Sequence, residues 1–162
     1  MREILFRGKC QDTGRWYEGQ YIHLHKTTYC FKEDYDRDKD NDIHQIVFER
    51  MTDWNLPNQH LRVDVIPETV GQYTGLTDKN GKKIFEGDIV KYTEFHKFSD
   101  DEDLESAEEK SERISVVKFA YGKFTPLPIR YNCEDSWYSY ATDNFEIIGN
   151  IHDNPELLKG GD

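Results

Sequence analysis

The chain reads FRGKCQDTGRWYEGQYI from Phe6 to Ile22, and a related stretch reads YTGLTDKNGKKIFEGDIV from Tyr73 to Val90. Each stretch opens with an aromatic residue, any residue and a glycine, and five further residues precede its second glycine. An aromatic-Glu-Gly step and an apolar pair follow in both, with one extra residue before the third glycine of the second stretch. The shared spacing predicts two related structural units made by duplication, residues 1–64 and 65–158.

The glycines of the two stretches predict matching turns. Asn80-Gly81 is typical of a type I′ hairpin turn, because both residues accept positive φ values. Asp12-Thr13-Gly14 predicts the equivalent bend, since Asp bonds the backbone two residues on and Gly takes the left-handed position. Glu18-Gly19 and Glu86-Gly87 are each expected to interrupt a strand with a turn or bulge.

Composition favours a β fold. Aromatic residues make up 14% of the 162 residues while all apolar residues make up 36%, so the core is expected to be rich in aromatic and β-branched side chains. We predict an all-β protein whose halves are small, strongly bent sheets or partly open barrels of SH3-like size. A tight hairpin is expected at Tyr121–Phe124 and a single helical turn at Asn154–Leu158. Further strands are expected at 20–31, 45–51, 88–95, 114–121, 124–129, 137–141 and 145–151.

Two charged stretches interrupt this pattern, at Lys32–Asp42 and Asp100–Glu112. Both lack apolar residues that would anchor them, so both are expected to be exposed excursions from the β scaffold. We expect disorder or a frayed helix in the second stretch, which lies in an acidic insertion at residues 94–113.

Charge and cysteine content limit the classes of function. The net charge of −11 opposes binding to nucleic acid or to an anionic membrane, since both rely on clustered Lys and Arg. Cys10, Cys30 and Cys133 are an odd number without a Cys-x-x-Cys pair, as expected for reduced thiols. The first residues lack the apolar run of a signal peptide. We expect a soluble, cytoplasmic protein.

Two segments are reminiscent of metal sites. Asp36–Asp42 alternates carboxylates like a calcium loop, but the sixth and twelfth positions hold Asn41 and Val47 where such a loop needs Gly and Glu. His23-x-His25 places two imidazoles on one face of a strand, and Cys10, Cys30 and His44 could join them. No second pair has ligand spacing, so we predict no metal and no cofactor.

Motifs for catalysis are also missing. The sequence has no Gly-x-Ser-x-Gly elbow, no phosphate-binding glycine loop before a Lys and no His-Glu-x-x-His pattern. Glu18 and Glu86 occupy equivalent places in the repeat and could act as an acid and base pair. A shared structural role in the turns is the simpler interpretation, and we predict no catalytic residues.

Trp137-Tyr138-Ser139-Tyr140 is the best candidate for a surface that binds a partner. In a strand, Trp137 and Ser139 would face one side while Tyr138 and Tyr140 face the other. Tyrosine and tryptophan are enriched at interfaces. We therefore assign Trp137, Tyr138 and Tyr140 as candidate partner-binding residues, with core or subunit packing as the alternative.

Long segments of the chain resemble the signature blocks of the YopX-like proteins, a family encoded by phages and prophages. These segments are Arg2–Lys9, Val65–Gly75, Asp78–Val90 and Ile148–Leu158. Between them, 32–58 and 94–113 correspond to regions where the family varies in length. The resemblance implies a mostly β protein and no established activity, cofactor or site residue.

We expect an uncharacterised phage or prophage accessory protein that binds a host or phage protein and is not an enzyme. Exposed strand edges favour homo-oligomers. One alternative is an acidic mimic of nucleic acid that acts on a host DNA- or RNA-binding protein. The other is a small hydrolase or nucleotide-handling enzyme whose site only the spatial arrangement would reveal.

Overall fold

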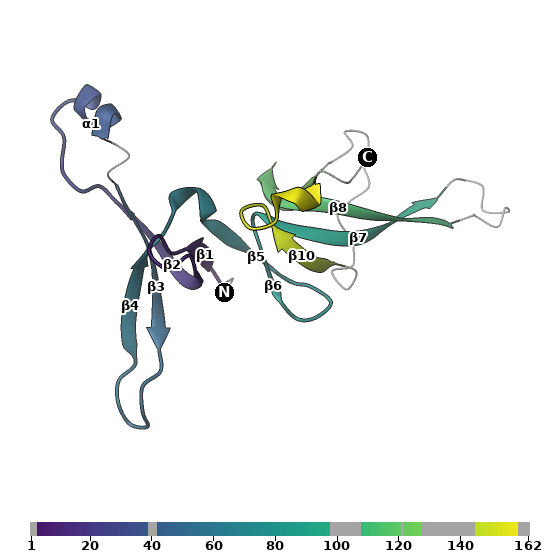
Figure 1. Ribbon diagram of the computed structural model, residues 1–162, viewed down its shortest axis with the longest axis horizontal. Coiled ribbons are helices and arrows are strands. Elements are labelled where there is room, and N and C mark those ends of the chain that lie inside the picture. Colours follow the sequence, from purple (N-terminus) through teal and green to yellow (C-terminus); the bar gives the residue numbers. More distant parts are fainter. Residues whose placement is uncertain (1–2, 39–41, 98–107, 121, 128–144, 159–162) are drawn as a thin grey trace. The chain divides into compact units, whose positions relative to one another are not determined.

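The computed structural model describes residues 3–38, 42–97, 108–120, 122–127 and 145–158, and it shows a mostly β protein with antiparallel sheets (Figure 1). The predicted fold class is confirmed at this level. The chain forms two compact units, Met1–Tyr73 and Thr74–Asp162. Val65 is fully buried and bridges Cys10, so the segment after Asp64 lies with the first unit. No helix in the described part of the chain is long and apolar enough to cross a membrane.

The first unit is an antiparallel sheet in which consecutive strands are neighbours, in the order β4-β3-β2-β1, and β5 pairs on the other side of β1. Gly71 and Gln72 of β5 pair with Arg7 and Phe6 of β1. A helix, α1, follows β2, and Figure 1 shows it at one end of this unit with the β3–β4 connection at the other. The bounds are β1 Phe6–Lys9, β2 Trp16–Leu24, α1 Lys32–Asp38, β3 Ile43–Arg50, β4 Gln59–Asp64, a 3-10 turn η2 Pro67–Thr69 and β5 Gly71–Thr77.

The core of the first unit is small and centres on Ile46 and Val65, neither of which is exposed. Gly8 allows Val65 to pack closely, since a Cβ on Gly8 would lie 3.1 Å from the Val65 side chain. The buried Cys10 thiol lies in the same region. A limited core of this kind is expected for a unit of this size.

The first copy of the repeat confirms one turn and corrects the other. Gly14 takes the expected left-handed conformation, with φ of +66°. The predicted interruption at Glu18-Gly19 is wrong, because β2 runs through both residues and Gly19 is buried. A Cβ on Gly19 would lie 2.1 Å from the Val47 carbonyl oxygen. Gly19 is therefore present because the backbone of β3 passes close to it, and no kink is needed.

The second unit holds an antiparallel sheet in the order β10-β7-β8-β9. Its core is a cluster of Ile84, Val90, Tyr92, Val117 and Phe145, with Phe124 and Ile147 packed against it. The Tyr92 and Phe145 rings meet edge to face at 5.6 Å, a favourable aromatic geometry. The bounds are β6 Lys83–Phe85, β7 Asp88–Lys97, β8 Glu108–Ala120, β9 Lys123–Leu127, β10 Glu146–Asn150 and a 3-10 turn η5 Pro155–Leu158.

In the second copy, the predicted turn at Glu86-Gly87 is confirmed. Gly87 has φ of +85°, its N–H donates to the Val117 carbonyl at 2.8 Å, and its own carbonyl accepts from Ile151 at 3.0 Å. Through these two hydrogen bonds, the turn contacts both β8 and the residue that follows β10. The hairpin at 121–124 and the helical turn at the C-terminus are also confirmed, by the β8–β9 pairing, the φ of +77° at Gly122 and η5.

The turn at Asn80-Gly81 has a different type from the one predicted. Among the described residues, Asn55 is the non-glycine residue with a positive φ, so Asn80 is not left-handed and the turn is not type I′. Gly81 alone has a positive φ, of +80°, and its N–H donates to the Asp78 carbonyl. The Asp78 N–H donates to Lys82 at 2.8 Å. This is the three-residue hairpin loop in which a type I turn precedes a left-handed glycine.

Other expected boundaries need correction. The strand predicted over 20–31 ends at Leu24. The 32–42 stretch contains α1, which buries none of its residues and so agrees with an exposed excursion. β4 was not predicted, because its two apolar residues, Leu61 and Val63, give a weak alternating pattern. In the acidic insertion, residues up to Lys97 and from Glu108 pair as strands, so frayed helix or disorder is wrong for 108–112. The strand predicted at 137–141 and Cys133 lie outside the described residues.

Candidate functional site

The pairing of β2 with β3 lines up polar side chains on one face of the first unit. Tyr21 lies opposite Ile46, His23 opposite His44, and Leu24 opposite Ile43. Because alternate residues of a strand share a face, this register continues to His25, just after β2, and Asp42, just before β3. His23, His25 and Asp42 form what we call the His-Asp cluster.

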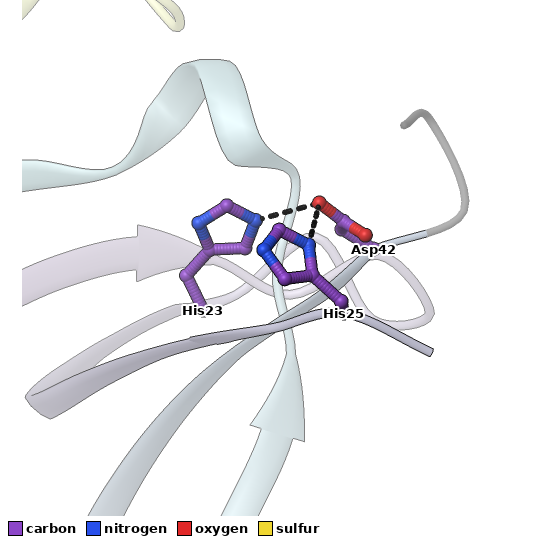
Figure 2. Close-up of side chains that lie close together, drawn as sticks. All are labelled: His23, His25 and Asp42. Carbon is purple, nitrogen blue, oxygen red and sulfur yellow. Dashed lines mark hydrogen bonds and ion pairs between the residues drawn. The ribbon is translucent and has the colours of Figure 1, made fainter. Parts of the chain in front are cut away.

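Asp42 lies between the two histidine rings (Figure 2). Its Oδ2 atom is 2.9 Å from His23 Nε2 and 2.9 Å from His25 Nδ1. The Asp42 side chain is 5% exposed, whereas those of His23 and His25 are 43% and 52% exposed. One carboxylate oxygen is thus held between two nitrogens that solvent can reach.

The surroundings lower the pKa of Asp42 and also that of the neighbouring His44. The hydrogen bond from His23 lowers the pKa of Asp42, burial opposes this, and the hydrogen bond from His25 lowers it further. Burial lowers the pKa of His44, and the neighbouring His23 lowers it further. The Tyr21 hydroxyl and His44 Nδ1 are hydrogen-bonded to each other at 2.5 Å. Burial also raises the pKa of Tyr21.

Aromatic contacts fix both rings of the cluster. The His23 ring stacks on His44 at a centroid distance of 4.5 Å and an angle of 13°. The His25 ring meets Tyr35 of α1 edge to face at 5.2 Å, and Tyr29 meets Tyr35 at 6.0 Å. The helix in the charged stretch therefore helps to position His25.

Imidazole nitrogens and a carboxylate oxygen are ligands that suit a divalent transition metal. The three ligand atoms of the His-Asp cluster all lie within 4.8 Å of one another. The shared face of His23 and His25 was expected. We considered Cys10, Cys30 and His44 as residues that could join the pair and predicted no metal, whereas the described residues bring in Asp42. Asp42 was missed because its position depends on the β2–β3 register, for which 26–41 gives no turn signal.

Glu18 and Glu86, the candidate acid and base pair, belong to different units. Glu18 is an exposed residue of β2 in the first unit, while Glu86 lies in the turn of the second unit and accepts a hydrogen bond from the Phe119 N–H at 3.3 Å. The contact of Glu86 agrees with a structural role in the turn. Trp137, Tyr138 and Tyr140 lie outside the described residues.

A second surface was not predicted at all. We call the connection between β3 and β4, residues 51–58, the tip loop. It exposes three large apolar side chains: Met51 is 83% exposed, Trp54 97% and Leu56 61%. Sequence reasoning missed this surface because a single tryptophan among polar residues is equally compatible with burial.

The tip loop has internal hydrogen bonds. The Leu56 N–H donates to the Asp53 carbonyl at 3.1 Å, and the Thr52 hydroxyl donates to the Pro57 carbonyl at 3.0 Å. Asn55 has φ of +68°, as the third residue of a type II turn requires. Trp54 is therefore the second residue of a defined turn.

The chain is similar to a solved structure, protein EF1440 from Enterococcus faecalis, with 24% sequence identity, a TM-score of 0.47 and coverage of 98% of this chain and 99% of that chain. No curated protein matches it. The family model of the YopX protein matches residues 5–159, nearly the whole sequence. The chain therefore belongs to the YopX protein family.

Proposed function

We propose that this YopX-family protein is a non-enzymatic accessory protein that binds another protein through its tip loop. The observation that carries the proposal is the exposure of Trp54, which at 97% is almost complete. Met51 and Leu56 extend the apolar surface beside it. Exposed apolar groups of this size mark interaction sites on soluble proteins, and Trp is enriched among the residues that dominate binding energy.

The tip loop is suited to binding because its conformation is formed in advance. The turn at Asp53–Leu56 and the Thr52–Pro57 hydrogen bond hold the backbone that carries Trp54. A loop ordered before binding loses less conformational entropy in the complex. The indole then adds a large apolar area with few rotatable bonds.

Charge indicates which kind of partner fits. The chain carries a net charge of −11, so a partner with a basic surface is attracted over long distances and an acidic one is repelled. We propose a bacterial or phage protein that has an apolar pocket for the Trp54 ring within a basic surface, and that meets this chain in the cytoplasm.

Mimicry of nucleic acid is the less favoured use of the same charge. A mimic needs carboxylates that are free to meet a basic groove, but several are paired within the chain. Asp34 binds Arg37 at 2.6 Å, Glu146 binds Lys79 at 2.7 Å and Glu112 binds Lys91 at 2.8 Å. The apolar tip is the more specific feature, and the proposal rests on it.

The experiment compares the wild-type protein with Trp54→Ala and with the control Phe31→Ala. Phe31 is also an exposed aromatic residue, 68% exposed, and precedes α1 at the other end of the unit. Proteins captured from a bacterial lysate are identified, purified and titrated against all three chains. Trp54→Ala is expected to weaken binding about 100-fold, while Phe31→Ala changes it less than about twofold.

The proposal also requires that association slows as salt is added, because the attraction is electrostatic. Equal affinity of the purified partner for wild type and Trp54→Ala would contradict it. Concentration-dependent self-association that Trp54→Ala abolishes would show that a second copy of the chain occupies the tip, and this too would overturn it.

A further inference from the structure

We infer that the His-Asp cluster is a binding site for one divalent transition-metal ion, with Zn²⁺ as the expected occupant. The ligand atoms are His23 Nε2, His25 Nδ1 and Asp42 Oδ2. The site is independent of the proposed protein-binding role. It lies where β3 begins, and the tip loop follows where β3 ends, roughly 25 Å further along the strand.

The distances fit a shared ion. A metal bound at about 2.1 Å from two ligands at right angles separates those ligands by about 3.0 Å, and a tetrahedral angle separates them by about 3.4 Å. The Asp42 oxygen lies 2.9 Å from each histidine nitrogen, and all three atoms lie within 4.8 Å of one another. An ion that binds all three atoms also requires the rings to turn until the two histidine nitrogens, which lie within 4.8 Å, are about 3.4 Å apart.

The ligand types select the class of metal. Two imidazoles favour zinc and similar transition metals, whereas calcium and magnesium prefer oxygen ligands throughout. Asp42 supplies a negative charge, so the ion is only partly neutralised. Three protein ligands leave a further coordination position for water or an added anion.

The cluster is both held in place and accessible. Stacking on His44 holds the His23 ring, and the edge of Tyr35 meets His25. The His44 ring is itself hydrogen-bonded to the Tyr21 hydroxyl, which gives the site an ordered outer layer. About half of each His23 and His25 side chain is exposed, so an ion can enter from solvent.

Metal binding has a structural consequence. His25 and Asp42 stand at the two ends of the segment 26–41, which contains α1. An ion shared by these residues and His23 joins the ends of the segment to β2. Binding is therefore expected to raise the melting temperature of the first unit, since the ion binds the folded arrangement and not the unfolded chain.

The test uses full-length protein without a histidine tag. Metal-free protein is titrated with ZnSO₄ by calorimetry and with CoCl₂ by visible absorption, which reports nitrogen and oxygen coordination directly. We expect about one ion per chain, and a more than tenfold loss of affinity in His23→Ala, His25→Ala and Asp42→Asn. The matched control is His60→Ala, which removes an exposed histidine of β4 that lies near Glu49 of β3 and should change affinity less than about twofold.

Two results would overturn the inference. One is wild-type protein that gives no cobalt spectrum and no saturable zinc binding at micromolar concentrations. The other is binding that His60→Ala weakens as much as His23→Ala does. Circular dichroism of the metal-free variants checks folding, and the wild-type titration decides the matter even if a variant fails to fold.

Discussion

Gly19 shows how one residue can be required by its neighbour and not by its own conformation. It lies within a continuous strand, yet a Cβ there would be 2.1 Å from the Val47 carbonyl oxygen and 2.8 Å from the Val47 carbonyl carbon. Backbone cannot move away as a flexible side chain can. The glycine therefore allows β2 and β3 to pair at this point, and with that pairing the His-Asp cluster forms.

Gly19→Ala is accordingly expected to destabilise the first unit by about 3 kcal/mol or more, because β2 and β3 must separate locally. Urea unfolding measures the change. Gly122→Ala is the control, since Gly122 has φ of +77° and open space where a Cβ would lie. Its cost should be only about 1 kcal/mol. Equal costs for the two variants would show that the close approach to Val47 is not important.

Asp78 gives stability that depends on pH. Burial alone raises the pKa of Asp78, but hydrogen bonds from the backbone N–H groups of Lys82, Ile147 and Asn80 outweigh it, and the pKa lies below its ordinary value of 3.8. A lowered carboxylate pKa stabilises the folded state at pH above the unfolded value, and this stabilisation is lost as pH falls through the folded value.

The pH dependence separates the charge of Asp78 from its shape. Asp78→Asn is expected to lose about 2 kcal/mol of unfolding free energy at pH 7, because a charged acceptor is replaced by a neutral one. As pH falls below 3.8 and through the lowered folded pKa of Asp78, the wild-type carboxylate is protonated and the difference should shrink. Urea unfolding at pH 7 and over a series of acidic pH values measures it. A difference that does not shrink as pH falls would contradict the role of the charge.

At the level of elements, the sequence predicted the hairpin turns better than the Glu-Gly steps beyond them. Gly-Gly spacing located both turns, since a left-handed position is a local requirement that glycine meets. The two Glu-Gly steps look alike but differ in structure. β2 continues through Gly19, whereas Gly87 lies in the turn between β6 and β7. That difference depends on distant strands: β3 packs on the step at Gly19, and β8 packs on the step at Gly87. Local sequence could therefore not show it.

The candidate sites also combine features that local sequence sets with features that distant strands set. The shared face of His23 and His25 comes from the two-residue period of a strand, and the sequence predicts it. Asp42 joins them only through the register between β2 and β3, set by segments that are not adjacent in sequence. The tip loop was missed because β4 has few apolar residues, so no strand was predicted after the turn-forming residues Asp53, Asn55, Pro57 and Asn58.

The turn between β5 and β6 can be tested at Asn80. Since Asn80 is not left-handed and its backbone N–H still donates to Asp78 in the variant, Asn80→Ala loses only the side-chain hydrogen bond to Asp78 and should cost less than about 1 kcal/mol. Gly81→Ala should cost about 1 kcal/mol, because Gly81 has φ of +80°. Thermal unfolding of both variants measures this. A large cost at Asn80 would indicate the type I′ turn that the Asn-Gly pair predicts.

On the scale of the whole molecule, the second unit has the features of an independent domain. Its core cluster of Ile84, Val90, Tyr92, Val117 and Phe145 is complete within residues 74–162. The bonds that connect its segments are internal as well, including Lys79 N–H to the Phe145 carbonyl and Gly87 N–H to the Val117 carbonyl. A domain with its own core can fold alone.

Residues 74–162 produced as a separate chain are therefore expected to fold and to melt in one cooperative transition, followed by circular dichroism. Val90→Asp in this fragment is the control, because Val90 is 1% exposed and a buried unpaired carboxylate there should abolish the transition. If the fragment shows no cooperative transition while the full chain does, the first unit supplies part of the stability of the second. The duplicated stretches would then describe one folding unit and not two.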